Sequence, residues 1–168
     1  MKKITLYSVF LTLFFPSVLF GQTFNQKENA VYIYNFIKNT EFPVKKATII
    51  IGVFGTTGVE AELKTLLSNK SANYIIKKIT IENVKAVDVI IVAKSSTKNL
   101  KAINTATAKL PILIITEQED QNYAGSCISL FMDEDDDFKT KYQLSPFNLR
   151  TRGLTLSSTL INNAILVR

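Results

Sequence analysis

The fold is decided by residues 48–68, which read TIIIGVFGTTGVEAELKTLLS. The first seven residues are mostly apolar on both faces of an extended chain, which is typical of a central strand in a parallel sheet. Gly55 to Gly58 then predict a tight loop, and residues 59–68 place Leu63 and Leu67 on one side of a helix. A strand that leads through a short loop into a helix predicts a βαβ unit.

The same pattern is repeated along the chain. Further strands are expected where apolar, β-branched runs alternate with helical stretches, at residues 74–81, 87–93 and 112–116. Helices are expected at residues 29–38 and 98–108, with one or two more within 146–167. Residues 126–132 and 138–144 predict an antiparallel hairpin around an acidic turn. Together these elements predict a single α/β domain with a mostly parallel open sheet, flanked by helices and finished by an antiparallel edge hairpin.

The N-terminus has the pattern of a secretory signal peptide. Met1-Lys2-Lys3 is a basic start, residues 4–20 carry no charge, and Gly21 precedes polar Gln22. The alternative is a membrane anchor, because an uncharged run of this length is close to the roughly 20 residues that span a bilayer. We expect a signal peptide at residues 1–21 and a secreted domain at residues 22–168, with a flexible lead-in over residues 22–28.

The composition excludes several classes of site. The chain contains no His and one Cys, which removes His-dependent triads, His-ligated zinc, internal disulfides and CxxC sites. The formal net charge is +6, but the lysines are scattered and form no dense basic stripe with interleaved aromatic residues. We therefore expect no nucleic-acid partner, no metal, no cofactor and no stable membrane insertion after signal cleavage.

Three local features each leave two interpretations open. The loop Gly52-x-x-Gly55-x-x-Gly58 is either a structural turn or an anion or small-ligand site, although its spacing differs from G-x-G-x-x-G. The run Asp133–Asp137 is either a solvated turn or a weak divalent-cation site, and it lacks the glycine of an EF-hand loop. Cys127 lies in an apolar run, which favours a buried thiol over a nucleophile.

Five segments in order resemble the YfiR family. The first helix and the corner after it, residues 28–43, are similar to the family pattern A-x-Y-(I/L)-Y-N-F followed by T/V-E-W-P, with Phe42 in place of Trp. The other four segments resemble its strands and its C-terminal motif, at residues 51–55, 87–92, 111–116 and 148–160. The resemblance covers almost all of residues 22–168.

The resemblance implies a periplasmic, non-enzymatic regulator of a Gram-negative bacterium, acting as a homodimer. Such a protein binds and represses a membrane-bound signalling protein, typically the periplasmic part of an inner-membrane diguanylate cyclase that controls cyclic di-GMP and biofilm growth. Better-known members carry paired cysteines for redox control, which the single Cys127 cannot supply. Two alternatives remain: a periplasmic small-ligand-binding sensor module coupled to a histidine kinase or other membrane receptor, and a hydrolase that uses Ser or Asp.

Candidate partner-binding residues come from the segments that carry the resemblance. The helix at residues 29–38 is unusually aromatic, which indicates either core packing or a contact surface, where tyrosine is enriched. The candidates from this helix, its corner and the C-terminal motif are Tyr32, Tyr34, Phe36, Phe42, Pro43, Arg150 and Arg152. No catalytic residue is assigned.

Overall fold

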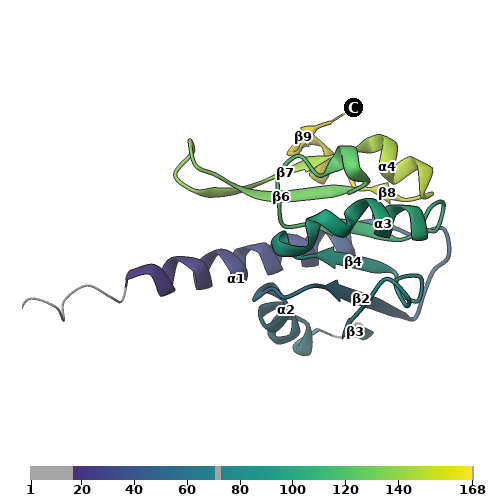
Figure 1. Cartoon of the computed structure of the whole chain (residues 1–168), viewed down its shortest axis with the longest axis horizontal. Coiled ribbons are helices and arrows are strands. Elements are labelled where there is room, and N and C mark those ends of the chain that lie inside the picture. Colours follow the sequence, from purple (N-terminus) through teal and green to yellow (C-terminus); the bar gives the residue numbers. More distant parts are fainter. Residues whose placement is uncertain (1–16, 71–72, 168) are drawn as a thin grey trace, which may run out of the picture.

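A computed structural model describes residues 17–70 and 73–167 as one α/β domain (Figure 1). The helices are α1 (Ser17–Lys38), α2 (Val59–Ser68), η1 (Lys94–Asn99), α3 (Leu100–Ala106), η2 (Asn122–Ala124), α4 (Pro146–Thr151) and α5 (Ser158–Asn162). The strands are β1 (Thr40–Glu41), β2 (Thr48–Phe54), β3 (Asn73–Lys78), β4 (Val89–Val92), β5 (Leu113–Thr116), β6 (Ile128–Asp133), β7 (Lys139–Leu144), β8 (Thr155–Leu156) and β9 (Ile165–Leu166).

Seven strands form the main sheet, in the order β3-β2-β4-β5-β6-β7-β9. Strands β2 to β6 run parallel, and β7 returns antiparallel to β6 as a hairpin. The predicted fold class is confirmed, with one refinement. Strand β9 pairs parallel to β7 and forms the actual edge, so the hairpin lies one strand inside it.

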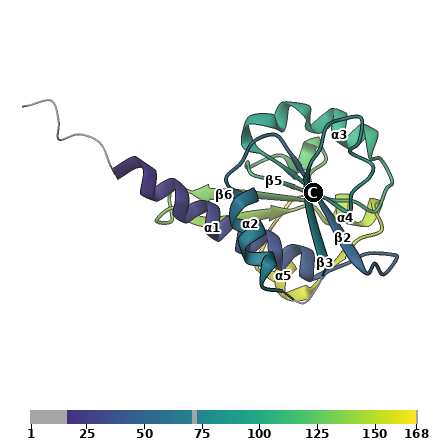
Figure 2. The same ribbon diagram turned by 90° about the horizontal axis from the view of Figure 1, so that it is seen from below.

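Helices cover both faces of the sheet because the chain reverses its direction of travel. From β2 it moves through α2 to β3 on one side, and it then returns to the other side of β2 as β4, α3 and β5. Right-handed crossovers in opposite directions place their helices on opposite faces. Figure 2 shows α3 on one face and α1 with α2 on the other. The order of strands thus reverses between β2 and β4, which defines a switch point.

The core is built from strands that are buried on both faces. Every residue of β4 and β5 is buried, and so is the middle of β2. Helix α1 contributes Ile33, Phe36 and Ile37 to this core. The ring of Phe36 packs edge-on against Tyr142 of β7, with 4.8 Å between centroids. The C-terminal half of α1 is therefore anchored in the domain, while its N-terminal half extends outward beside the β6–β7 hairpin (Figure 1).

Helix α1 is longer than its sequence pattern predicts. The expected helix begins at residue 29, whereas α1 begins at Ser17 and includes residues 22–28, which were expected to be a flexible lead-in. Within residues 22–28, Glu28 has a tertiary contact, because the Thr140 hydroxyl of β7 donates a hydrogen bond to its carboxylate at 2.9 Å. Residues 1–16 lie outside the described range, and the signal peptide stays a prediction. Among the described residues, no helix combines the length and hydropathy needed to cross a membrane.

The buried carboxylate of Asp88 ties the first strands together. It accepts a hydrogen bond from the Ile50 amide at 2.8 Å and pairs with the ammonium of Lys46. The Asp88 backbone also donates to the carbonyl of Ile50 and accepts from the amide of Leu113. One residue thus holds the starts of β2, β4 and β5 in register.

Replacing Asp88 tests this role. We expect Asp88→Ala to lower the free energy of unfolding by about 2–3 kcal/mol, because it leaves the Ile50 amide without its acceptor. Asp88→Asn keeps an oxygen for that amide and loses only the pairing with partly exposed Lys46, so its cost should be about 1 kcal/mol. Urea unfolding followed by circular dichroism measures both. Equal losses in the two variants would mean that the charge, not the amide contact, is what matters.

The tip of the β6–β7 hairpin is conformationally strained. Asp137 and Phe138 have φ angles of 50° and 56°, and the Lys139 amide donates to the Asp136 carbonyl at 3.0 Å. Positive φ at both central residues is the pattern of a type I′ turn, which normally takes Asn-Gly. The Phe138 side chain is 62% exposed, so little packing compensates for this backbone conformation.

Glycine at position 138 should therefore stabilise the protein. We expect Phe138→Gly to raise the free energy of unfolding by about 0.5–1 kcal/mol, because the left-handed conformation costs a side-chain-bearing residue about 1–2 kcal/mol. Phe147 is similarly exposed but helical, so Phe147→Gly should destabilise by up to about 1 kcal/mol. Urea denaturation of both variants measures the difference. The same sign for both would contradict the assignment of strain to the turn.

Candidate functional site

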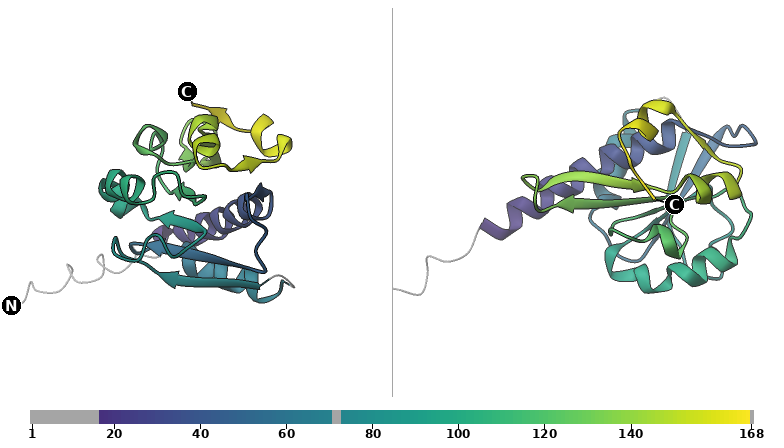
Figure 3. Two further views of the ribbon diagram at one scale, coloured as in Figure 1. Left: turned by 90° about the vertical axis from the view of Figure 1, so that its right-hand side faces the viewer. Right: turned by 90° about the horizontal axis from the view of Figure 1, so that it is seen from above.

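Two hollows lie at opposite ends of the parallel strands. The first, the corner groove, surrounds the segment between α1 and the start of β2 and has a volume of about 520 Å³. The second, the switch-point cleft, lies where β2, β4 and β5 end, and has a volume of about 800 Å³. In the views of Figure 3 the C-terminal segments lie close to the end of α1. Ile37 and Lys38, at that end of the helix, line the corner groove.

The corner groove is half apolar and carries an excess of lysines. Phe42, Val44 and Tyr74 supply apolar surface, and Val44 is 64% exposed. The groove is lined by Ile37, Lys38, Thr40, Glu41, Phe42, Val44, Lys45, Lys46, Ala47, Ile49, Asn73 and Tyr74. Because Lys46 already pairs with Asp88, Lys38 and Lys45 are the lysines of this set that remain to offset Glu41. The lining keeps a small excess of positive charge, which suits an acidic surface.

A short two-stranded sheet joins this corner to the C-terminal motif. In β1 and β8, Thr40 pairs with Leu156 and Glu41 pairs with Thr155 in antiparallel register. The Gly153 backbone, in the turn after α4, also packs near Pro43, since a Cβ at Gly153 would lie 3.9 Å from the proline ring. The two segments that supplied the candidate residues are therefore neighbours in space.

The seven predicted contact residues differ in exposure. Pro43 and Arg150 are exposed, whereas Tyr32, Tyr34 and Phe42 are partly buried and pack against the core. The other two, Phe36 and Arg152, are buried, and Arg152 is only 4% exposed. Burial gives Phe36 and Arg152 structural contacts, and a partner-binding role for the other five residues stays a prediction.

Arg152 joins α4 to the end of α3. Its guanidinium donates to the Asn104 side-chain oxygen at 2.6 Å, to the Thr107 carbonyl at 3.0 Å and to the Leu110 carbonyl at 3.4 Å. Burial lowers the pKa of this guanidinium from its ordinary value. Arg152 is therefore buried against uncharged acceptors, whereas the sequence predicts a surface residue.

Tyr34 connects α1 to the edge strand β3. Its ring meets Tyr74 edge-on at 6.4 Å between centroids, and the Lys70 ammonium lies 5.2 Å from the Tyr34 ring centre. A cation at this distance from a ring face is attracted to it. Tyr34 thus links the aromatic helix to Tyr74, which itself lines the corner groove.

Three parts of the fold enclose the switch-point cleft. The loops after β2, β4 and β5 form its base, α1 forms one wall and the β6–β7 hairpin forms another. Gln26 of α1 packs so closely over Gly58 that a side chain at Gly58 would collide with it. The lining residues are Asn25, Gln26, Asn29, Thr56, Thr57, Gly58, Lys94, Ser95, Glu117, Gln118, Glu119, Phe131, Met132 and Glu134.

Glu117 is the most enclosed acid of this cleft. It directly follows β5, and its carboxylate accepts a hydrogen bond from the Thr57 hydroxyl at 2.9 Å. The same hydroxyl accepts from the Val59 amide at the start of α2. Burial raises the pKa of Glu117, and the hydrogen bond from Thr57 only partly opposes this effect. The sequence interpretation singled out the loop at Gly55 to Gly58 and missed this glutamate.

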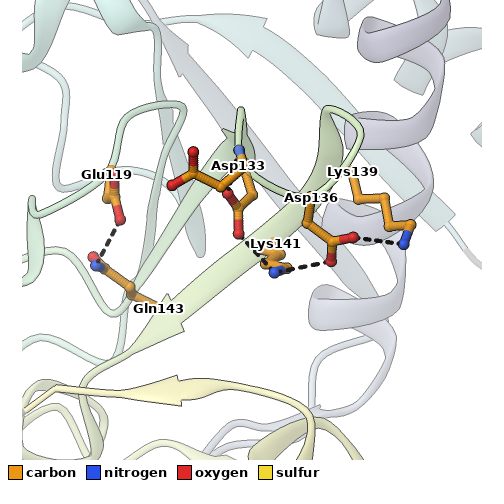
Figure 4. Close-up of polar contacts among 7 residues, drawn as sticks. Glu119, Asp133, Asp136, Lys139, Lys141 and Gln143 are labelled. Atoms are coloured by element: carbon orange, nitrogen blue, oxygen red, sulfur yellow. Dashed lines mark hydrogen bonds and ion pairs between the residues drawn. The ribbon is translucent and has the colours of Figure 1, made fainter.

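The acidic turn of the hairpin is paired with lysines (Figure 4). The Lys141 ammonium lies 2.6 Å from Asp133 and 3.0 Å from Asp136, and Lys139 lies 2.7 Å from Asp136. Hydrogen bonds from these lysines lower the pKa of both aspartates. Within residues 17–70 and 73–167, no three His, Cys, Asp or Glu side chains are grouped to hold a metal ion.

Cys127 is buried, as its apolar sequence context predicts. Its amide donates to the Ile114 carbonyl at 2.8 Å, which aligns it with the first half of β5. Burial raises the pKa of its thiol, so the thiolate form is disfavoured.

Solved structures share this fold. A conserved domain protein from Vibrio cholerae O1 biovar El Tor str. N16961 matches with a TM-score of 0.58 at 12% identity. An ABC domain from Streptococcus pneumonia, crystallised with L-Trp, matches with a TM-score of 0.57 at 10% identity. Each match covers 85% of this chain but only 60% of the solved chain. At these identities the matches show the fold alone.

Comparison with protein families is more specific. No curated protein matches the chain significantly. A family model described as YfiR/HmsC-like (DUF4154) matches residues 26–165, which include every strand of the main sheet except the last residue of β9. This match covers most of the chain and agrees with the resemblance of its segments. The chain therefore belongs to the YfiR/HmsC-like family.

Proposed function

We propose that this protein is a periplasmic regulator that binds and represses a membrane-bound signalling protein, most simply a diguanylate cyclase. The observation that carries the proposal is the YfiR/HmsC-like match over residues 26–165, since this is a family of regulator domains. The protein acts by contact, with no reaction of its own. Repression would limit cyclic di-GMP, and release of the partner would favour biofilm growth.

The corner groove is the contact surface that we assign to this partner. Pro43 and Val44 are exposed beside partly buried Phe42, and the groove lysines surround this apolar centre. An apolar centre with a charged rim is the usual anatomy of a protein interface. Arg150, exposed on the adjoining α4, extends the basic rim. The partner should therefore present an acidic rim around an apolar anchor.

A second candidate function, a small-ligand-binding sensor module, is favoured by the switch-point cleft. Ligands of open α/β sheets bind at the carboxyl ends of the strands, where the strand order reverses. The cleft lies at that place and is lined mainly by hydroxyl, amide and charged groups. Such a module would act on a histidine kinase or another membrane receptor, and it would also work in the periplasm.

We also propose that the protein is a homodimer formed through strand β3. This strand pairs only with β2 in the described part of the chain, and Ile75 on it is exposed. An unpaired edge of this length is a template for pairing with another chain. Two copies related by a two-fold axis can pair antiparallel about Ile75, so that Ile75 faces its own copy and Ile76 faces Tyr74 of the partner copy. This register keeps the lysines at 77 and 78 of the two copies apart.

A charged residue at the β3 edge tests the dimer. We expect the wild type to elute as a dimer and Ile75→Lys as a monomer in size-exclusion chromatography with light scattering, because the new lysine would be buried at the pairing edge. Tyr123→Lys, a similar change at an exposed site on η2, should leave the dimer intact. A monomeric wild type would contradict the proposal.

Binding to a membrane sensor tests the leading function. The full chain would be exported and purified from the periplasm, where its intact mass should correspond to residues 22–168. It should then bind the periplasmic part of a diguanylate cyclase encoded beside its gene, measured by calorimetry. We expect Val44→Asp to weaken binding at least about tenfold, because it places an acid at the centre of a groove that faces acidic groups.

Two further variants make this test specific. Arg150→Glu should weaken binding less than Val44→Asp, because rim charges contribute less than buried anchors. Tyr123→Asp alters an equally exposed site away from the groove and should have no effect. If Val44→Asp binds as well as wild type, the interface lies outside the corner groove. If folded wild type does not bind, the proposed partner is wrong.

A further inference from the structure

The switch-point cleft has a net negative lining. Its titratable groups are Lys94 on η1, Glu117 and Glu119 after β5, and Glu134 on the hairpin, so acids outnumber bases by three to one. Helix α1 contributes only the amides of Asn25, Gln26 and Asn29. Glu119 is exposed, and its pKa is raised by some loss of solvation and then by the nearby charges of Asp120 and Asp133.

Hydrogen bonds fix Glu117 and its neighbour at the base of the cleft. The Thr57 hydroxyl fixes its carboxylate at the base of the cleft, directly after β5. Neighbouring Gln118 is held in turn, because the Thr97 hydroxyl donates to its side-chain oxygen at 2.8 Å. Glu117 forms no ion pair among the described residues, and the hydroxyl of Thr57 is the side-chain group that donates a hydrogen bond to its carboxylate.

The outer part of the cleft offers apolar surface. Phe131 and Met132 are successive residues of β6, and both line the same hollow as Glu117. Because side chains alternate along a strand, they offer apolar surface from its two faces. Ligand pockets typically combine such apolar walls with a few placed polar groups that fix orientation. A molecule with an ammonium group and an apolar body would satisfy both parts, with its charge at Glu117 and its body against the hairpin.

We propose that the switch-point cleft binds a small organic cation, with Glu117 as its counter-ion and the hairpin residues Phe131 and Met132 against its apolar part. This inference rests on the second candidate function and names its ligand class. The bound molecule would contact the strand loops, α1 and the hairpin together, because all three line the cleft.

A matched pair of probes tests the proposal. Benzylamine and benzoate have the same size and apolar ring but opposite charge at neutral pH. We expect benzylamine to bind the protein purified from the periplasm, with amide NMR shifts centred on residues 56–58, 94–95 and 117–119. Benzoate should not bind at concentrations up to about 10 mM, because the lining is acidic. Tighter binding of benzoate, or no binding of either probe, would overturn the proposal.

Variants identify the counter-ion. Glu117→Gln should weaken benzylamine binding at least about tenfold, because it removes the charge and keeps an acceptor for Thr57. Glu41→Gln, which removes an exposed acid from the corner groove, should bind benzylamine normally. Unchanged binding by Glu117→Gln would assign the cation elsewhere and reject this site.

Stability separates lost binding from lost structure. Because burial raises the pKa of Glu117, the folded protein disfavours the carboxylate, and this cost develops as the pH rises above the ordinary value. Glu117→Gln should therefore melt at a higher temperature than wild type at about pH 7.5, with the difference gone at about pH 4. A variant that binds less while melting higher cannot owe its loss to unfolding.

The titration requires no membrane partner, so its failure would leave the regulator proposal intact. Conversely, the Val44→Asp variant should bind benzylamine normally even where it fails to bind the sensor, because Val44 lies outside the cleft.

Discussion

The structure depends on one constraint: strands β2, β4 and β5 are apolar on both faces and must be covered on both. A single helix layer cannot do this, so the chain places α2 and α3 on opposite faces by crossing over in opposite directions. The reversal separates the loops after β2 and β4 at their carboxyl ends. The switch-point cleft is thus a consequence of how the core is buried, and the residues that follow each strand determine its chemistry.

Elements encoded by local sequence were predictable, and those that depend on distant partners were not. The bounds of β2 and α2 agree with the sequence prediction, because an apolar run, a glycine loop and a helical stripe define them locally. The two-residue strands β1, β8 and β9 have no such pattern. They exist because hydrogen bonds such as that from the Ser157 amide to the Asn39 carbonyl join segments far apart in the chain.

The same distinction explains the candidate residues. Arg152 has the sequence context of a surface residue, yet its acceptors come from α3 and the turn after it, more than forty positions earlier: Asn104, Thr107 and Leu110. These three acceptors can be identified only from the tertiary structure. Glu117 could have been suggested from the sequence, because it directly follows an apolar strand and so lies at the edge of the sheet where ligands bind. Its carboxylate is held by Thr57, sixty positions earlier in the chain, which no local pattern could place beside it.

Helix α1 connects the two hollows. It lines the cleft through Asn25, Gln26 and Asn29 and reaches the corner groove through Ile37 and Lys38, about 18 Å further along its axis at 1.5 Å per residue. Glu28, among the cleft residues, and Phe36, next to the groove residues, attach the helix to β7. A ligand shifts an equilibrium only by binding one conformation better than another. If the cleft controls the groove, α1 must therefore hold two positions against β7, and contacts such as Thr140 to Glu28 are those that would differ between them.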